Sequence, residues 1–291
     1  MKSEIDNLKS RIPLGLIAGW GRFPLHVAEK CQALGIPLVT VGISGHADPK
    51  LRAMSKQFHW AGVARLGKMI RCMKKAGVRK AVMAGKIHKH VMYQPWRWLT
   101  LFPDWRTVRF WFRQRRRDNR DDSLLLGMID EFALDGIEFG SALEFCPELL
   151  VSAKLLTKRG PTPKEEADIA FGWQLAKEMG RLDVGQSVAV KEKAVLAVEA
   201  IEGTDQMVLR AGALCRAGGF TVVKVAKPQQ DMRFDVPTVG PSTLESMKKA
   251  GAGVLAVEAG KTILIDEEAT VALANRLGLT LIAYAEPPTG D

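Results

Sequence analysis

Short apolar runs alternate with amphipathic stretches along the first half of the chain. The runs have the length and continuous hydrophobicity of strands that are buried on both faces. The stretches between them carry apolar residues at helical spacing. This pattern predicts strands at 14–18, 37–43 and 80–84, with helices over 23–34 and 65–76. Such alternation is typical of a largely parallel sheet, whose ligands lie near the carboxyl ends of the strands.

The second half of the chain repeats the alternation after a change in composition. The stretch 157–163, TKRGPTP, has the composition of a boundary, and a long helix is expected over 165–179. Two runs that flank 191–193 predict a hairpin, and Thr204 is a good N-cap for the next helix. Further strands are expected at 221–227, 253–259, 262–265 and 280–285, with helices over 242–250 and 267–277.

These elements predict an α/β fold with two domains, in keeping with a length of 291 residues. The first is a Rossmann-like parallel-sheet N-terminal domain over 10–150. A linker over 151–163 leads to a second, mixed-sheet α/β C-terminal domain over 164–287, where we expect the catalytic site.

Composition restricts the function to a few classes. Hydrophobic residues make up 47% of the chain and charged residues 25%, which is ordinary for a globular protein with a core. The net charge of +10 favours an anionic partner: nucleic acid, a phosphorylated metabolite or an anionic membrane surface. The four cysteines form no CxxC pair, which argues against a zinc site and fits a reducing cytoplasm. We find no signal peptide and no apolar run of about 18 residues, so we expect no membrane span.

The segment 93–112 is unusually aromatic. It holds four of the seven tryptophans, and arginines crowd the stretch 113–120 that follows. Aromatic residues beside arginines are typical of a membrane-interface element or an apolar ligand groove. They also suit single-stranded nucleic acid, whose bases stack on aromatic rings. A helix that packs its aromatic side on the sheet is the alternative interpretation.

A glycine turn follows the first expected strand. Gly19 and Gly21 flank a tryptophan, and a helix begins just beyond them, which is how an α/β domain presents a helix N-terminus to an anion. Pro24 stands where a dinucleotide fingerprint has its third glycine. A plain tight turn and a ligand-binding turn both remain open. Lys86 leaves the carboxyl end of the strand at 80–84 and is either a substrate ligand or a solvated lysine.

The loop 229–240, QQDMRFDVPTVG, concentrates unlike charges. Asp231 and Asp235 stand four residues apart with Arg233 between them, and Lys224 and Lys227 lie just upstream. If the loop is extended, residues 231, 233 and 235 share one face. An ion-paired strand edge is the alternative. Because catalytic residues collect on loops held by a rigid scaffold, we interpret this loop as the reaction centre.

An internal repeat adds acidic residues to this picture. The sequence VLAVEA occurs at 195–200 and 254–259, and each copy ends near a carboxylate, Glu199 or Glu258. Glu202 follows the first copy. Coincidence between alanine- and valine-rich strands is one explanation. The other is that these acids converge with the aspartates of the loop at one end of the sheet. Converging carboxylates would bind Mg²⁺ (or Mn²⁺) and suit metal-assisted attack of water on phosphorus.

Several segments together resemble the LpxI-type UDP-2,3-diacylglucosamine pyrophosphatases of lipid A biosynthesis. The matching segments are GLIAGWGRFP, MAGKI, LLTKRGPTPKEEADIAFGWQLAKEMGRLDVGQSV, VLAVEAIEGTD, KPQQDMRFDVPTVG and GVLAVEAGKTILID. The resemblance implies a Rossmann-like domain, a distinct α/β domain and a substrate between them. It also implies hydrolysis to UMP and 2,3-diacylglucosamine 1-phosphate with a divalent cation, by attack of water on the α-phosphorus. The essential aspartate of the family lies in QDxRxDxP, matched here by Asp231 and Asp235 without a choice between them.

The residues and the resemblance together define the candidate site. We expect a catalytic group of Asp231, Asp235 and Arg233. We expect substrate-binding residues at Gly19, Gly21, Lys86, Gly203, Thr204, Lys224, Lys227 and Gln230. We expect metal ligands at Asp231, Asp235, Glu199, Glu202 and Glu258.

The same interpretation predicts the partners. They are an acylated UDP-sugar and the inner leaflet of the cytoplasmic membrane, which the segment 96–112 would contact, and they do not include nucleic acid. The protein would be cytoplasmic and peripheral to that membrane, and a homodimer is compatible with it. Two other functions compete: a nucleic-acid-binding protein that uses 93–120, and a nucleotide-dependent oxidoreductase that uses 19–24. The latter needs a ribose-binding acid about twenty residues beyond the glycines, where 42–45 offers none.

Overall fold

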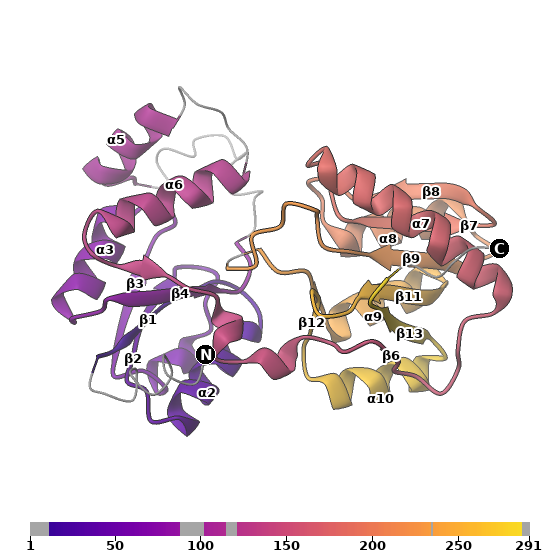
Figure 1. Ribbon diagram of the computed structural model, residues 1–291, viewed down its shortest axis with the longest axis horizontal. Coiled ribbons are helices and arrows are strands. Elements are labelled where there is room, and N and C mark those ends of the chain that lie inside the picture. Colours follow the sequence, from indigo (N-terminus) through magenta and orange to yellow (C-terminus); the bar gives the residue numbers. More distant parts are fainter. Residues whose placement is uncertain (1–11, 88–101, 115–120, 234, 287–291) are drawn as a thin grey trace. The chain divides into compact units, whose positions relative to one another are not determined.

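The computed structural model describes residues 12–87, 102–114, 121–233 and 235–286. The chain divides between Cys146 and Pro147 into two compact units. Each unit has a sheet with helices packed on it (Figure 1). The predicted α/β class is thereby confirmed, with an all-parallel sheet in the first unit and a mixed sheet in the second.

The first unit is built on a five-stranded parallel sheet in the order β3-β2-β1-β4-β5. This is the order of a Rossmann-like fold, and the winding of the chain reverses between β1 and β4. Near-complete burial of β1 and β2 explains their continuous hydrophobicity. The strands are β1 (Leu14–Ala18), β2 (Leu38–Ile43), β3 (Gln57–Ala61), β4 (Lys80–Ala84) and β5 (Glu138–Phe139).

The helices of the first unit lie on both faces of this sheet, with α2 on one face and α3 and α6 on the other (Figure 1). α5 packs against α3 and α6. The helices are α2 (Phe23–Ala33), α3 (Leu66–Lys75), α5 (Trp105–Gln114) and α6 (Asp121–Ala133), with 3-10 turns η1 (Pro49–Arg52) and η3 (Ala142–Glu144).

Asp104 joins α5 to α3. One carboxylate oxygen accepts a hydrogen bond from the Thr107 N–H of α5 at 3.0 Å, and the other accepts one from the Lys68 N–H of α3 at 3.0 Å. The Thr107 hydroxyl accepts a third, from the Leu66 N–H. Because the first N–H groups of a helix have no partner inside it, these contacts cap two helices at once.

The second unit is built on a six-stranded mixed sheet in the order β6-β13-β11-β9-β7-β8. β7 runs against both of its neighbours, so β8, β9, β11 and β13 end at the same edge. The same unit also contains a small parallel sheet formed by β10 and β12. The strands are β6 (Lys154–Leu155), β7 (Ser187–Lys191), β8 (Ala194–Val198), β9 (Phe220–Lys224), β10 (Thr238–Val239), β11 (Ala252–Glu258), β12 (Ile263–Leu264) and β13 (Thr280–Tyr284).

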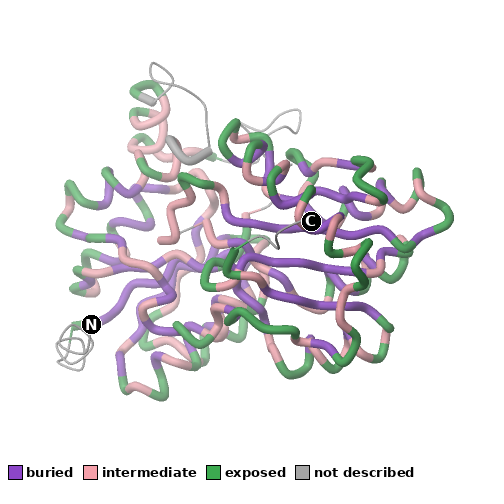
Figure 2. Tube along the Cα trace, turned by 45° about the vertical axis from the view of Figure 1, so that its right-hand side comes forward, coloured by how far each residue is buried: buried purple, intermediate pink, exposed green. Residues whose placement is uncertain are grey.

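Two cores flank this sheet. α7 covers one face, where Trp173 and Ile169 pack with Val223 of β9. α8, α9 and α10 cover the other, where Val222 of β9 is buried. Successive strand residues point to opposite faces, so the central strands are buried throughout (Figure 2). The helices are α7 (Pro163–Arg181), α8 (Thr204–Leu214), α9 (Pro241–Ala250) and α10 (Glu267–Leu277), with a 3-10 turn η4 (Pro147–Leu149).

The segment 151–163, expected to be a linker, belongs to the second unit. β6 pairs with β13 in antiparallel register, and the Val151 N–H donates to the Thr262 carbonyl. The segment therefore contains an edge strand and the N-cap of α7, and it is not a flexible linker between the two units. The predicted hairpin of β7 and β8 is confirmed.

Candidate active site

The loop after β9 folds back on itself instead of extending. The Asp235 N–H donates to the Asp231 carbonyl at 3.1 Å, which closes a turn. The Gln230 amide spans this turn and donates to both the carbonyl, at 2.6 Å, and the carboxylate of Asp235. The condition under which residues 231, 233 and 235 would share one face, an extended loop, is therefore not met, because local hydrogen bonds favour the turn.

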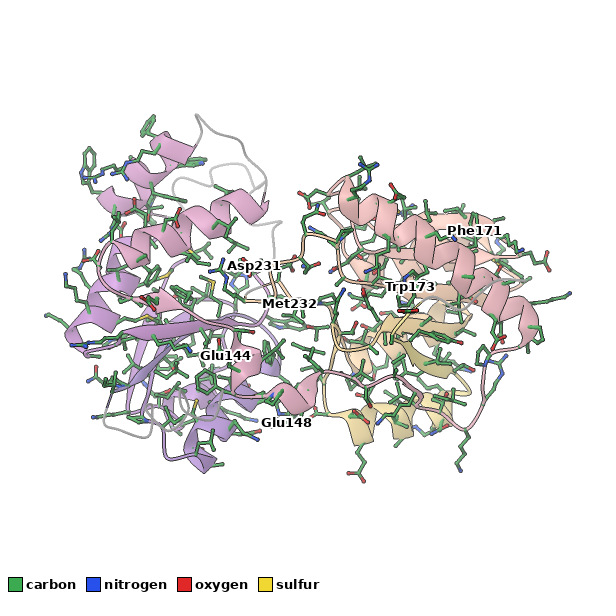
Figure 3. The ribbon with its side chains drawn as sticks, in the orientation of Figure 1. Glu144, Glu148, Phe171, Trp173, Asp231 and Met232 are labelled. Carbon is green, nitrogen blue, oxygen red and sulfur yellow. The ribbon has the colours of Figure 1, made fainter. Side chains whose placement is uncertain are left out.

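Asp231 and Arg233 form an ion pair inside the turn. The Arg233 guanidinium contacts both carboxylate oxygens, at 2.6 Å from Nη2 and 3.0 Å from Nε. These hydrogen bonds lower the pKa of Asp231 against the opposing effect of burial. Within the described residues, the Asp235 carboxylate has only the neutral Gln230 amide as a partner. Figure 3 labels Asp231 and Met232 on this loop.

The loop leaves the sheet from a clamped peptide at Ala226. The Glu258 carboxylate at the end of β11 accepts the Ala226 N–H at 2.8 Å. Lys177 of α7 donates to the Ala226 carbonyl at 2.9 Å and to Glu258 at 2.6 Å. Burial acts to raise the pKa of Glu258, but hydrogen bonds from Lys177, Lys261 and Ala226 outweigh it and leave that pKa lowered. The Lys177 ammonium also lies 6.0 Å from the ring centroid of Trp173, labelled in Figure 3.

Further contacts tie the start of the loop to the end of α7. Lys227 pairs with Asp183 at 2.5 Å, and its N–H donates to the Gln230 side chain. Gln229 donates to the Gly180 carbonyl at 3.0 Å. Lys227, expected to bind substrate, is thus also a structural anchor of the loop.

A second polar cluster lies at the beginning of α8. Lys224, at the end of β9, is 3% exposed and donates to the Thr204 hydroxyl at 2.7 Å. That hydroxyl in turn donates to Glu199 at 2.9 Å. Thr204 is therefore the first residue of α8 rather than its N-cap, which is Gly203 at φ 82° with no side-chain cap. The predicted cap is wrong because the buried lysine and glutamate engage the hydroxyl.

The structure brings the expected carboxylates to one edge of the sheet but does not gather them. Glu199 and Glu258 follow β8 and β11, which two other strands separate. Glu202 pairs instead with Arg210 at 2.6 Å. Burial acts to raise the pKa of Glu202, but hydrogen bonds, including that from Arg210, leave it lowered. Among the described residues, no group of three or more side chains is placed to hold a metal ion. The predicted convergence of Glu199, Glu202 and Glu258 with the loop is therefore not seen. Glu202 and Glu258 pair with basic side chains, and Glu199 binds Thr204 through one oxygen while its other oxygen has no partner in the described structure.

The expected residues of the first unit lie together at the point where the winding of the sheet reverses. Trp20 and Lys86 form an antiparallel bridge between the turns that follow β1 and β4. A side chain at Gly19 would place its Cβ 2.7 Å from the Lys86 carbonyl oxygen. Gly21 adopts φ 106°, which glycine tolerates best. A glycine turn packed against the neighbouring turn accounts for both glycines. The binding of substrate by Gly19, Gly21 and Lys86 stays a prediction.

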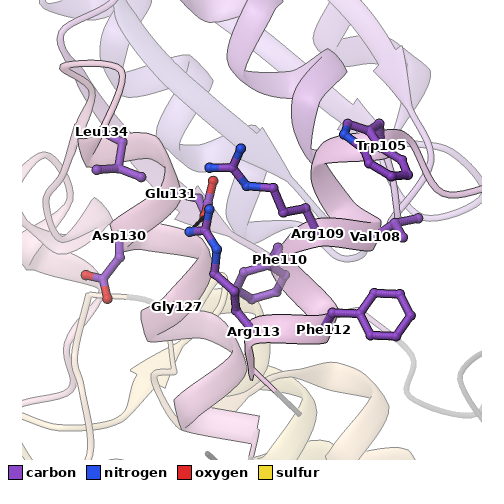
Figure 4. A pocket seen from close by; sticks show the side chains of 10 residues that line it. All are labelled: Trp105, Val108, Arg109, Phe110, Phe112, Arg113, Gly127, Asp130, Glu131 and Leu134. Atoms are coloured by element: carbon purple, nitrogen blue, oxygen red, sulfur yellow. Dashed lines mark hydrogen bonds and ion pairs between the residues drawn. The ribbon is translucent and has the colours of Figure 1, made fainter. Parts of the chain in front are cut away.

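The aromatic segment is described from residue 102 to residue 114, so Trp96 and Trp98 lie outside the described residues. α5 and α6 border an open hollow of about 780 Å³. Arg109 and Arg113 of α5 lie on the same side as Glu131 of α6, whereas Phe112 points away from it (Figure 4). The hollow is lined by Trp105, Val108, Arg109, Phe110, Phe112, Arg113, Gly127, Asp130, Glu131 and Leu134.

Sequence reasoning missed Lys177 and Asp183, which hold the loop from α7. The only feature in the sequence that could have pointed to these two residues is their position relative to α7. Lys177 stands four residues after Trp173 on the helix face that packs on β9, and Asp183 follows the end of the helix. Neither position identifies the partner, which lies more than forty residues away in sequence.

Comparison with known proteins agrees with this architecture. The family described as LpxI N-terminal domain matches residues 13–149, and the LpxI C-terminal domain matches residues 152–282. The UDP-2,3-diacylglucosamine pyrophosphatase LpxI of Caulobacter vibrioides is 34% identical over 281 residues, which is 92% of this chain and 96% of that protein. Both halves of the chain are thus covered, and the chain belongs to the LpxI family.

Proposed function

We propose that the protein hydrolyses UDP-2,3-diacylglucosamine to UMP and 2,3-diacylglucosamine 1-phosphate, a step of lipid A biosynthesis. Water attacks the α-phosphorus, and the bond between that phosphorus and the bridging oxygen breaks. The family and the named relative support the substrate and the reaction class. The observation that carries the site is the loop after β9, which holds two carboxylates and a guanidinium in one turn at the carboxyl edge of the sheet.

The charges of the loop suggest a different role for each aspartate. The charge of Asp231 is neutralised by Arg233, and the Asp231 carboxylate fixes the direction of the guanidinium. A guanidinium held in this way is suited to bind a phosphoryl oxygen of the substrate. Asp235 has only an amide partner among the described residues, so its charge remains available. We therefore assign Asp235 to the attacking water or to a divalent cation, and Asp231 to the positioning of Arg233.

The proposal includes a divalent cation, Mg²⁺ (or Mn²⁺), but with fewer protein ligands than the sequence predicts. Glu202 and Glu258 do not fit as ligands, because each pairs with basic side chains. Glu199 keeps one buried oxygen without a partner in the described structure, but it belongs to no group of three side chains that could hold a metal there. Asp235 does fit, since Mg²⁺ is usually held by one or two carboxylates together with substrate phosphates and water, whereas both oxygens of Asp231 are engaged by Arg233. When bound, the ion would polarise the phosphoryl group and offset its charge.

The beginning of α8 is the proposed binding region for an anionic part of the substrate. Gly203 is the N-cap, and no side chain caps the helix. The free N–H groups of a first turn attract phosphate. Lys224 adds positive charge beside this first turn, because its ammonium group donates a hydrogen bond to the Thr204 hydroxyl. Lys227 and Gln230 contribute by holding the loop in place.

The acyl chains of the substrate place the reaction at a membrane. We propose that the protein acts there as a peripheral enzyme on the cytoplasmic side. Among the described residues, no helix is long and apolar enough to cross a bilayer.

Hydrolysis in ¹⁸O-labelled water tests both the reaction and the phosphorus attacked. The protein is incubated with the acylated UDP-sugar and Mg²⁺, and the products are analysed by mass spectrometry. Label in UMP is expected, whereas label in the lipid phosphate would indicate attack on the β-phosphorus. The absence of UMP with every divalent ion would overturn the proposal.

Variants assign the roles. We expect Asp235→Asn to lower kcat by about a thousandfold, within the range of lost electrostatic stabilisation. Asp231→Asn should have a smaller effect, because it weakens the hold on Arg233 but removes neither that guanidinium nor the Asp235 carboxylate. Glu245→Gln, on the exposed side of α9, is the matched control. Full turnover by both aspartate variants would exclude the loop as the reaction centre.

A further inference from the structure

The outward face of α5 carries an apolar stripe on a helix that also holds three arginines. Trp105, Val108 and Phe112 recur at helical spacing and fall on one face. Trp105 is 81% exposed and Phe112 is 69% exposed. Large apolar side chains gathered this way on a surface mark an interaction site rather than a core.

Cationic groups accompany this stripe. α5 carries Arg106, Arg109 and Arg113 and no acidic residue. Arg106 and Arg113 both bind Glu131 of α6, at 2.9 and 3.0 Å, which fixes the rotation of the helix. Arg109 is exposed and forms no ion pair within the described part of the chain. Its guanidinium is thus available to an anion beside the aromatic rings.

The hollow between α5 and α6 continues the apolar surface. Most of its lining is apolar, and Leu134, which follows the end of α6 and is 71% exposed, borders it. Aliphatic side chains are thus part of the same surface as the aromatic ones (Figure 4). A platform for single-stranded nucleic acid needs ring faces and cations, but it gains little from aliphatic side chains such as Val108 and Leu134. A lipid interface accommodates all of these groups.

We propose that the outward face of α5 docks on an anionic phospholipid bilayer. Trp105 and Phe112 enter the interface between headgroups and acyl chains, and Arg109 binds lipid phosphates. This inference rests on the proposed function, because it identifies the element that brings the enzyme to a lipid-borne substrate. The stripe is short, so binding is reversible.

Cosedimentation of the full chain with vesicles tests the docking. We compare vesicles of phosphatidylethanolamine and phosphatidylglycerol with vesicles of phosphatidylcholine alone. The wild-type protein is expected to bind the anionic vesicles, and high salt should weaken this binding. Replacing Trp105 and Phe112 together by alanine should lower the partition constant by roughly tenfold to a hundredfold. Arg109→Gln should lower it about fivefold.

Matched controls carry the same changes elsewhere. Leu182→Ala removes an apolar side chain that is 64% exposed in the second unit, and Arg216→Gln removes an exposed charge there. Neither should alter vesicle binding. Equal losses in the controls, equal binding to both vesicle types, or displacement of the vesicles by single-stranded RNA would overturn the docking surface.

Activity separates this inference from the proposed function. With substrate dispersed in detergent micelles, the double alanine variant should keep the wild-type kcat, whereas with substrate in anionic vesicles its rate should fall with its binding. An equal loss in micelles would instead assign the rings to acyl-chain binding or to stability, against docking. Vesicle binding without any hydrolysis by the wild-type protein would overturn the proposed function and leave the docking surface supported.

Discussion

Lys177 and Glu258 clamp the chain at Ala226, across two successive peptide units. Their side chains are 2.6 Å apart, and between them they bind both the carbonyl and the N–H of Ala226. The lysine comes from the helix on one face of the sheet and the glutamate from the strand next to β9. Because Ala226 lies shortly before the loop, which begins at Gln229, the pair fixes the direction in which the chain leaves the sheet.

Removal of this clamp should weaken both the fold and catalysis. Glu258→Ala leaves the Ala226 N–H and Lys177 without their acceptor, so we expect the free energy of unfolding to fall by about 2–4 kcal/mol. kcat should fall more than KM rises, since the loop is displaced. Glu258→Gln, which can still accept the N–H, should restore most of the turnover. Urea unfolding and steady-state kinetics measure the two effects.

The control for the clamp is Glu267→Ala. It breaks the exposed Lys154–Glu267 pair, and we expect a change of about 0.5 kcal/mol or less. Wild-type kcat in Glu258→Ala would show that the clamp does not position the loop.

The same carboxylate makes stability depend on pH. The pKa of Glu258 is lower in the folded protein than its ordinary value of 4.5. The folded state therefore binds the proton more weakly, and Glu258 contributes stability above pH 4.5 that is lost as the pH falls through the lowered folded pKa. Urea unfolding from pH 7 down to about pH 3 should show the advantage of wild type over Glu258→Gln shrink in acid. An advantage that grew in acid would contradict this sign.

The Thr204 hydroxyl should matter more than other buried threonine hydroxyls. Thr204→Val removes an acceptor for Lys224 and a donor to Glu199, so we expect a loss of about 1–3 kcal/mol in unfolding free energy. Thr204→Ser should recover most of it. Thr262→Val is the matched control, because its buried hydroxyl has no partner in the described structure and its removal should be neutral or stabilising. Equal losses at both positions would refute the importance of the cluster.

Gly19 should tolerate a side chain worse than a glycine in open space does. In Gly19→Ala the methyl group would press on the backbone of the turn after β4, at 2.7 Å from the Lys86 carbonyl oxygen. We expect a loss of about 2–3 kcal/mol, typical of overpacking. Gly35→Ala, where φ is 68° and the space is open, should lose about 1 kcal/mol from backbone strain alone. Thermal and urea unfolding of both variants measure the difference.

Local pattern was enough to predict the α/β class and the central strands, but not the short or half-exposed strands β3, β5, β6 and β10. The apolar run 14–18 and the hairpin around 191–193 were predictable because strand burial and turn residues act over a few positions. The partner of each polar or charged side chain could not be predicted in this way. Glu258 was expected to bind a metal and binds Lys177, which the chain supplies from 81 residues away. Thr204 was expected to cap α8, but the buried Lys224, twenty residues on, recruits its hydroxyl. Such choices depend on packing between distant elements, which sequence spacing does not encode.

The shared cap at Asp104 makes two helices open as one. If α5 leaves its place, the Lys68 N–H loses the carboxylate and the Leu66 N–H loses the Thr107 hydroxyl, so the first turn of α3 frays with it. The free energy of local opening of α5 therefore includes the cost of uncapping α3. A bilayer that holds α5 should consequently slow amide hydrogen exchange at the first turn of α3, a turn that itself needs no contact with lipid.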